Sequence, residues 1–152
     1  MRPLQLLAYS IIWLASLPAD ARTVVIDDSG TLPYHATLAM HWQELSPRSR
    51  ASTLMVGTLE LRVHLALAPW LHRRGHIYMV LPAQQPGAIT ATWTTNGRLL
   101  PGQVSTGGRA LVYAGPITAP FIEDMVHLTV IVDGRRMLQS YPVNFRFEME
   151  ED

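Results

Sequence analysis

Residues 89–102, ITATWTTNGRLLPG, constrain the fold of this chain more than any other stretch. Ile89, Ala91 and Trp93 alternate with threonines, so one face of the segment is apolar and the other carries hydroxyl groups. This two-residue period, together with the β-branched side chains, predicts a half-buried β-strand. The Asn96-Gly97 dipeptide that follows favours a tight hairpin turn, because both residues tolerate positive φ angles. The stretch therefore predicts antiparallel β structure, and it says little about activity.

The rest of the chain supplies partner strands for this segment. Residues 59–67 alternate between apolar and mostly polar residues, which is typical of a strand with one buried and one exposed face. Residues 34–42 favour a strand, with a short helix over residues 36–40 as the alternative. Further β patterns occur at residues 23–26, 76–81, 109–114, 126–132 and 143–149, and Asp133-Gly134 repeats the hairpin signal. About seven to nine strands separated by turns, without an amphipathic helical pattern, predict an all-β antiparallel sandwich or small barrel.

Residues 1–21 have the layout of a secretory signal peptide. Arg2 is followed by an apolar run over residues 4–17 and then by Ala19-Asp20-Ala21, the small-x-small pattern at which signal peptidases cleave. The run is short for a membrane-spanning helix, which needs about 20 residues. We expect cleavage to leave residues 22–152 as one domain without a membrane span, in the periplasm, at the cell surface or outside the cell. A retained N-terminal anchor is the alternative.

Charge and cysteine content narrow the choice of partners. Twelve acidic residues balance 12 basic ones and the pI is near 7.0, so the composition indicates no basic surface for nucleic acid. The chain contains no cysteine, which indicates that the fold of the exported domain depends on packing rather than on disulfides. Acidic residues gather at residues 148–152, and we interpret them as a solvated terminus that discourages pairing between sheet edges.

Residues 89–102 resemble the third strand and following turn of immunoglobulin-like domains, in which a buried tryptophan precedes a polar hairpin of the Asn-Gly or Asp-Gly type. The paired cysteines of that family, and the tyrosine two residues before the second of them, are absent here. The resemblance implies an immunoglobulin-like or fibronectin-like sandwich. This class includes bacterial adhesin modules, pilus subunits and their chaperones, although a shared fold does not transfer a function.

Motifs that would indicate an enzyme are missing from the sequence. It has no Gly-x-Ser-x-Gly, no His-Glu-x-x-His and, because it lacks lysine, no Ser-x-x-Lys. The adjacent carboxylates Glu123-Asp124 and Asp27-Asp28 differ from a glycosidase pair, which lies across a cleft. Gly107-Gly108 lacks the lysine and the helix of a phosphate-binding loop. We therefore predict that the protein is not an enzyme and uses no cofactor.

Met40 and His41 suggest an alternative function in copper handling, because a thioether and an imidazole together favour Cu(I). The chain has no Met-x-Met or His-x-His motif to extend such a site. His64 and His127 fall on the exposed faces of two predicted strands and are candidates to oppose each other. Two imidazoles do not make a metal site, and exposed sheet histidines are the alternative interpretation.

Protein binding accounts better for two loops and one strand. Trp70 stands near Arg73 and Arg74, and tryptophan and arginine dominate interface hot spots, although Trp70 could instead close one end of the core. Phe121 belongs to an apolar loop that either caps the sandwich or meets a partner. The strand at residues 143–149 could be shared with another subunit by β-strand addition, or be an ordinary last strand.

These observations together predict an exported, non-enzymatic β-sandwich that binds another envelope or secreted protein. An adhesin-like or pilus-like subunit, or an accessory of an envelope assembly or secretion system, would fit. The residues predicted to bind the partner are Trp70, Arg73, Arg74 and Phe121. A small periplasmic copper-binding protein that uses Met40 and His41 is the second hypothesis.

Overall fold

The computed structural model describes residues 22–32, 37–43, 53–83, 88–136, 140–142 and 144–152. Its regular structure consists of strands and two single-turn 3-10 helices, η1 (Ala68–Trp70) and η2 (Gly134–Arg136). The strands are β1 (Thr23–Val25), β2 (Thr37–Ala39), β3 (His41–Trp42), β4 (Leu54–Ala66), β5 (Arg74–Val80), β6 (Ile89–Thr95), β7 (Gly102–Ser105), β8 (Arg109–Pro116), β9 (Phe121–Asp133), β10 (Ser140–Pro142) and β11 (Arg146–Glu151).

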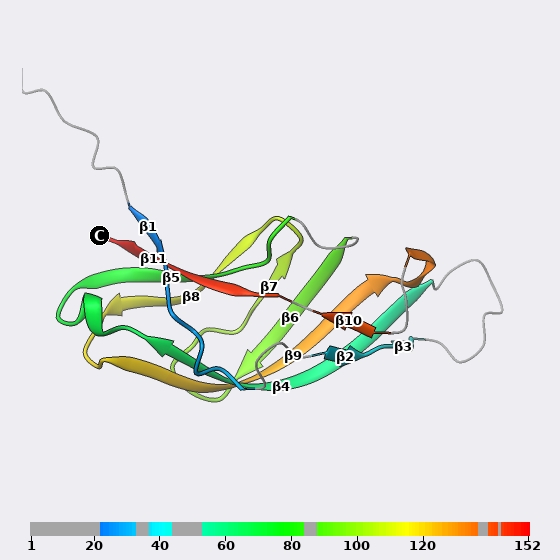
Figure 1. Ribbon diagram of the computed structural model, residues 1–152, viewed down its shortest axis with the longest axis horizontal. Coiled ribbons are helices and arrows are strands. Elements are labelled where there is room, and N and C mark those ends of the chain that lie inside the picture. Colours follow the sequence, from blue (N-terminus) through cyan, green and yellow to red (C-terminus); the bar gives the residue numbers. More distant parts are fainter. Residues whose placement is uncertain (1–21, 33–36, 44–52, 84–87, 137–139, 143) are drawn as a thin grey trace, which may run out of the picture.

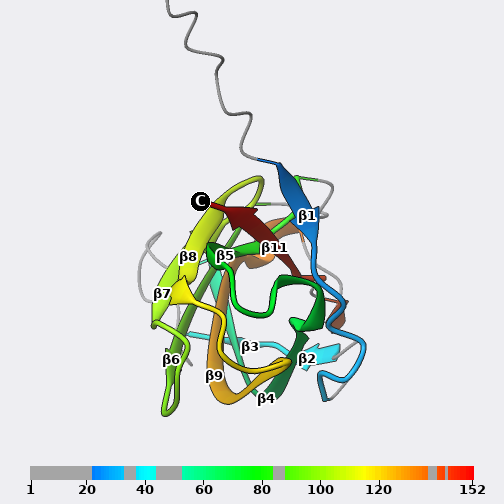
Figure 2. The same cartoon turned by 90° about the vertical axis from the view of Figure 1, so that its left-hand side faces the viewer.

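The strands form two antiparallel sheets and a short ribbon. The four-stranded sheet has the order β1-β11-β5-β8, the five-stranded sheet has the order β3-β4-β9-β6-β7, and β10 pairs with β2. The longest pair, β4 with β9, lies along the bottom of the view in Figure 1. Figure 2 shows the two sheets end-on, one above the other. The predicted antiparallel all-β class is therefore confirmed.

The two sheets face each other across one apolar core. Trp93 on β6 is 2% exposed, and Ile77 and Met79 on β5 of the other sheet belong to the same buried cluster. The indole Nε1 of Trp93 donates a hydrogen bond to the carbonyl of Leu100 at 2.9 Å, so its polar atom is satisfied inside the core. The predicted burial of Trp93 is confirmed. The apolar positions of residues 59–67 are buried as well, with Leu59 only partly buried.

Hydrogen bonds outside the strand pairs connect the two sheets along both flanks. On one flank the chain leaves β1, and the carbonyl of Asp27 accepts a hydrogen bond from the Ala66 N–H of β4 at 3.0 Å. On the other flank the Leu100 N–H, just before β7, donates to the carbonyl of Val112 in β8 at 2.7 Å. Figure 2 shows β1 and β7 on opposite sides of the molecule. The two layers are thus held together by backbone contacts as well as by the core.

Two strands begin earlier than the sequence pattern predicts. β4 begins at Leu54 rather than at residue 59, and β9 begins at Phe121 rather than at residue 126. In both strands one buried position lacks the apolar side chain that the alternating pattern requires. In β4 this position is Gly57, and in β9 it is the polar residue Asp124. Phe121, predicted to lie in a loop, is therefore the first residue of a strand.

The β6–β7 hairpin is present, but its turn differs from the predicted one. Residues 96–101 connect the two strands, and neither Asn96 nor Gly97 is among the described residues with a positive φ angle. Gly97 is required for a different reason, because a Cβ there would lie 2.5 Å from Oδ1 of Asp124. The glycine provides close approach of the backbone to a side chain rather than a left-handed conformation.

The hairpin turn predicted at Asp133-Gly134 is also wrong. After Asp133 the chain enters η2 instead of a two-residue turn, and β10 pairs with β2 rather than with β9. A Cβ at Gly134 would lie 2.5 Å from a ring carbon of Trp42. Both Asn/Asp-Gly dipeptides thus serve tertiary packing in this fold.

The predicted signal peptide, residues 1–21, lies outside the described residues. Within the described ranges, no helix is both long enough and apolar enough to span a membrane.

Candidate functional site

The outer face of the β4–β9 pair carries two histidine–glutamate pairs. His64 lies directly opposite Glu123, and His127 lies opposite Glu60. The distances from imidazole Nδ1 to carboxylate Oε1 are 3.0 Å and 3.1 Å, respectively. The expectation that His64 and His127 oppose each other is wrong, because the strand register places a glutamate opposite each imidazole.

His64 is held in place by several neighbours besides Glu123. Its ring stacks on the ring of Phe121, with centroids 5.3 Å apart and planes 18° from parallel. Its backbone N–H donates to Oγ1 of Thr31 at 3.1 Å. Gly30 lies so close that a Cβ there would be 2.8 Å from the imidazole Cδ2. The imidazole therefore supports the exposed Phe121 ring in a defined position.

Three large apolar side chains near His64 are exposed to solvent. The exposed fractions of Leu32, Phe121 and Met125 are 56%, 48% and 39%. Met125 lies opposite Arg62 on one side, and Leu32 forms a β-bridge with Arg62 on the other, so the three side chains project from the same face. On this face the three apolar side chains alternate with the polar or charged residues Arg62, His64 and Glu123, a mixture that is typical of protein interfaces. We call this surface the β4–β9 patch: Leu32, Arg62, His64, Phe121, Glu123 and Met125.

Trp70 and Phe121, two of the residues predicted to bind a partner, belong to connected segments at one end of the molecule. The Leu67 N–H, next to η1, donates to the carbonyl of Pro120, next to β9, at 2.7 Å. Trp70 is 7% exposed, so its side chain closes this end of the core, in line with the alternative interpretation of the sequence. Phe121 instead points outward and forms part of the β4–β9 patch.

Arg73 and Arg74, the other two predicted residues, face the acidic end of the described chain. The guanidinium of Arg73 donates two hydrogen bonds to the carboxylate of Glu151, at 2.9 Å and 3.0 Å. Arg74 Nε lies 3.7 Å from Oδ2 of Asp152. Both cations are therefore already matched by carboxylates of the same chain, and neither lies in the β4–β9 patch.

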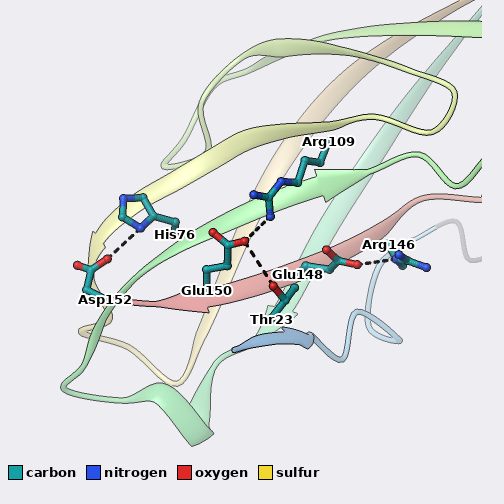
Figure 3. A network of polar contacts seen from close by, with 7 residues as sticks. All are labelled: Thr23, His76, Arg109, Arg146, Glu148, Glu150 and Asp152. Atoms are coloured by element: carbon teal, nitrogen blue, oxygen red, sulfur yellow. Dashed lines mark hydrogen bonds and ion pairs between the residues drawn. The ribbon is translucent and has the colours of Figure 1, made fainter. Parts of the chain in front are cut away.

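Glu148, Glu150 and Glu151 are part of a sheet rather than of a solvated terminus, so that prediction is wrong for them, and the exposed Asp152 follows the strand. β11 lies between β1 and β5 and has no free edge while β1 is in place. Figure 3 shows the contacts of its carboxylates: Glu150 with Arg109 and Thr23, Glu148 with Arg146, and Asp152 with His76. The hydrogen bond from Arg109 lowers the pKa of Glu150 below its ordinary value. This network explains how an acidic strand is tolerated in the interior of a sheet.

Met40 and His41 are directed to opposite sides of the five-stranded sheet. The Met40 sulfur lies at the core side, where a Cβ on Gly57 would be 2.5 Å away from it. His41 pairs with Val56 and is exposed on the outer side. In the ranges that the structure describes, no group of three or more His, Cys, Asp or Glu side chains could hold a metal ion. The arrangement gives no support to the copper-binding alternative.

Sequence reasoning missed most of the β4–β9 patch. Arg62 and His64 stand at exposed positions of the predicted strand, but nothing local shows which strand lies beside them. Reading residues 121–133 as one strand would have placed Phe121, Glu123 and Met125 on its outer face, because alternate residues share a face. The register between β4 and β9 joins residues about 60 positions apart, and a single sequence does not contain that information.

Comparison of the chain with protein-family models, with curated proteins and with solved structures finds no match. The candidate site therefore rests on the geometry of this molecule alone.

Proposed function

We propose that this protein is an exported β-sandwich of the immunoglobulin-like or fibronectin-like kind that binds another protein of the bacterial envelope or a secreted protein. It would serve as an adhesin-like or pilus-like subunit, or as an accessory of an assembly or secretion system. It would carry out no chemical reaction on its partner.

The β4–β9 patch is the observation that carries this proposal. Phe121, Met125 and Arg62 represent the aromatic, methionine and arginine side chains that are enriched in protein interfaces. The three exposed apolar side chains share one sheet surface with Arg62, His64 and Glu123 between them, and the strand register fixes their relative positions. The Phe121 ring stacks on that of His64, so less side-chain freedom would be lost when a partner covers it.

Export is supported by the layout of residues 1–21, with one arginine, an apolar run and a small-x-small site. An exported protein without cysteine or enzyme motif, whose described residues form no metal cluster, is more simply explained as a binding or structural component than as a catalyst.

Photo-crosslinking in the cells that produce the protein tests the proposal. Phe121 is replaced by the photoreactive amino acid p-benzoylphenylalanine, and the cells are illuminated before the protein is isolated. We expect a discrete adduct of higher mass with a second protein, because the reactive ring would lie inside the interface.

Gln103 provides a matched control position, since it is exposed on β7 of the same sheet and separated from the patch by β6. The same photoreactive residue at position 103 should give little or no adduct. Absence of an adduct at position 121, or equal adducts at both positions, would contradict the proposal.

A further inference from the structure

Arg62 occupies the centre of the β4–β9 patch and has a rigid backbone. It pairs with Met125 of β9 on one side. On the other side its N–H donates to the Leu32 carbonyl at 2.8 Å, and its carbonyl accepts from the Leu32 N–H at 2.9 Å. Its exposed side chain therefore rises between two exposed apolar side chains, from a backbone whose N–H and carbonyl are both bonded to Leu32.

Two carboxylates flank the Arg62–Met125 row on this face. Glu60 stands two residues before Arg62 on β4, and Glu123 stands two residues before Met125 on β9. Oε1 of each lies within ion-pair distance of the imidazole directly opposite it. Among the described residues, five other arginines form ion pairs with carboxylates: Arg73, Arg74, Arg109, Arg135 and Arg146. No such pair is formed by Arg62 within the described ranges.

The surroundings of Arg62 would strengthen an ion pair made with a partner. Exposed ion pairs contribute little because water screens them. Covering Leu32, Met125 and Phe121 with apolar groups of a partner would exclude water around the guanidinium and lower the local dielectric constant. A guanidinium also binds a carboxylate through two parallel hydrogen bonds, which makes the contact specific in direction.

We propose that the β4–β9 patch recognises a protein segment in which a carboxylate is flanked by apolar side chains, with Arg62 as the residue that selects the carboxylate. This inference rests on the proposed protein-binding function and adds the chemistry of the partner. The apolar side chains would cover Leu32, Met125 and Phe121, while the carboxylate would pair with Arg62.

A pair of matched peptides tests this inference by nuclear magnetic resonance. Isotope-labelled protein is titrated with acetyl-Leu-Glu-Leu-amide and, separately, with acetyl-Leu-Gln-Leu-amide, which differ only in the charge of the central side chain. We expect both peptides to shift the signals of Phe121 and Met125. The glutamate peptide should also shift the Arg62 Nε–H signal and bind more than about fivefold more tightly, which is the upper limit for an exposed ion pair.

Two variants show which arginine is responsible. Arg62→Gln should abolish the preference for the glutamate peptide while leaving weak binding of both peptides. Arg98 is an exposed arginine in the β6–β7 connection, and Arg98→Gln should leave the preference unchanged. Equal binding of the two peptides to the unmodified protein, a preference that survives in Arg62→Gln, or no shift of patch signals at the solubility limit of the peptides would overturn the inference.

The outcome is distinguishable from that of the photo-crosslinking experiment. A specific adduct at position 121 combined with equal binding of both peptides would leave protein binding in place and remove the role of Arg62. Absence of the adduct would remove both proposals.

Discussion

Asp124 is a buried carboxylate that fixes the connection between β6 and β7. Its side chain points into the protein from β9, where it is 7% exposed, and Oδ2 accepts a hydrogen bond from the Leu99 N–H at 2.9 Å. The next peptide carbonyl, that of Leu100, accepts the hydrogen bond from the Trp93 indole. One carboxylate and one indole therefore hold a connection that lacks the two-residue turn expected from its sequence.

Replacement of Asp124 should weaken the fold. Asp124→Ala leaves the Leu99 N–H without its acceptor, and a buried unsatisfied donor costs about 1–3 kcal/mol of unfolding free energy. Urea denaturation measures the change. Glu123→Ala is the control, because the neighbouring carboxylate is exposed and its ion pair should contribute less than about 1 kcal/mol. Equal losses for the two variants would show that the Asp124 contact is unimportant.

Glycine is required at positions 97 and 107 for different reasons, and replacement of each by asparagine distinguishes the two reasons. Gly107 has a φ of 78°, and a Cβ there would meet Ala83 at an ordinary distance of 3.6 Å. Asparagine tolerates such a φ, so Gly107→Asn should have a small effect. Gly97→Asn should destabilise the protein by about 1–3 kcal/mol, because its Cβ would clash with Asp124. Thermal unfolding checks both, and a larger loss for Gly107→Asn would contradict this account.

At the scale of the elements, strands with regular alternation were predictable from sequence. β6 spans the predicted residues 89–95, and β8 starts at the predicted Arg109. In these strands the local pattern agrees with the fold, because buried positions carry apolar residues. β9 departs from this rule at Asp124, whose hydrogen-bond partner Leu99 comes from another part of the chain. The alternation at the beginning of β9 is therefore interrupted by a polar residue whose partner no local pattern reveals.

β11 overlaps the predicted strand at residues 143–149 but continues into acidic residues that the sequence assigned to a solvated terminus. Its carboxylates suit a solvated tail by composition alone, yet Arg109 of β8 reaches across β5 to Glu150 and stacks on the Tyr78 ring, 4.2 Å from its centroid. The neutralising cation lies 41 positions away in the sequence. Tertiary ion pairs override the local preference for solvent here.

The Glu150–Arg109 pair predicts a pH-dependent stability. The pKa of Glu150 is lowered in the folded protein, so this carboxylate stabilises the fold above its unfolded-state pKa, and the contribution is lost as the pH falls through the folded-state value. At pH 7 the unmodified protein should have a higher denaturation midpoint than Glu150→Gln. The two midpoints should converge as the pH falls below about 4, the range in which glutamate titrates.

Arg109→Gln serves as the companion variant for this experiment. It removes the donor that lowers the pKa of Glu150, so the pH dependence assigned to the pair should disappear. A difference between the unmodified protein and Glu150→Gln that stays constant with pH would show that the pair does not contribute in this way.

At the scale of the whole molecule, two sheets packed on one core present several outer surfaces, and the sequence does not reveal which of them is used. The four residues that were chosen by residue type do not form one site. Trp70 lies in the core, and Arg73 and Arg74 pair with acidic residues. Only Phe121 belongs to the β4–β9 patch. The patch is created by register, which sets Arg62 between Leu32 and Met125.

The proposed export predicts a defined start of the mature chain. Signal peptidase should cleave after Ala21, so the protein isolated from its producing cell should begin at Arg22. N-terminal sequencing or the intact mass measures this directly. A chain that retains residues 1–21 would support the alternative of an N-terminal anchor.

Oxidative footprinting of the β4–β9 patch tests the central claim most directly. Hydroxyl radicals are generated in the producing cells and, in parallel, in the purified protein, and oxidation of individual side chains is read by mass spectrometry. Phe121 and Met125 should be oxidised in the purified protein and protected in cells. Trp42, 52% exposed at the other end of the same sheet, should be oxidised equally in both samples. Equal oxidation of Phe121 and Met125 in both samples would contradict a protein partner on this surface.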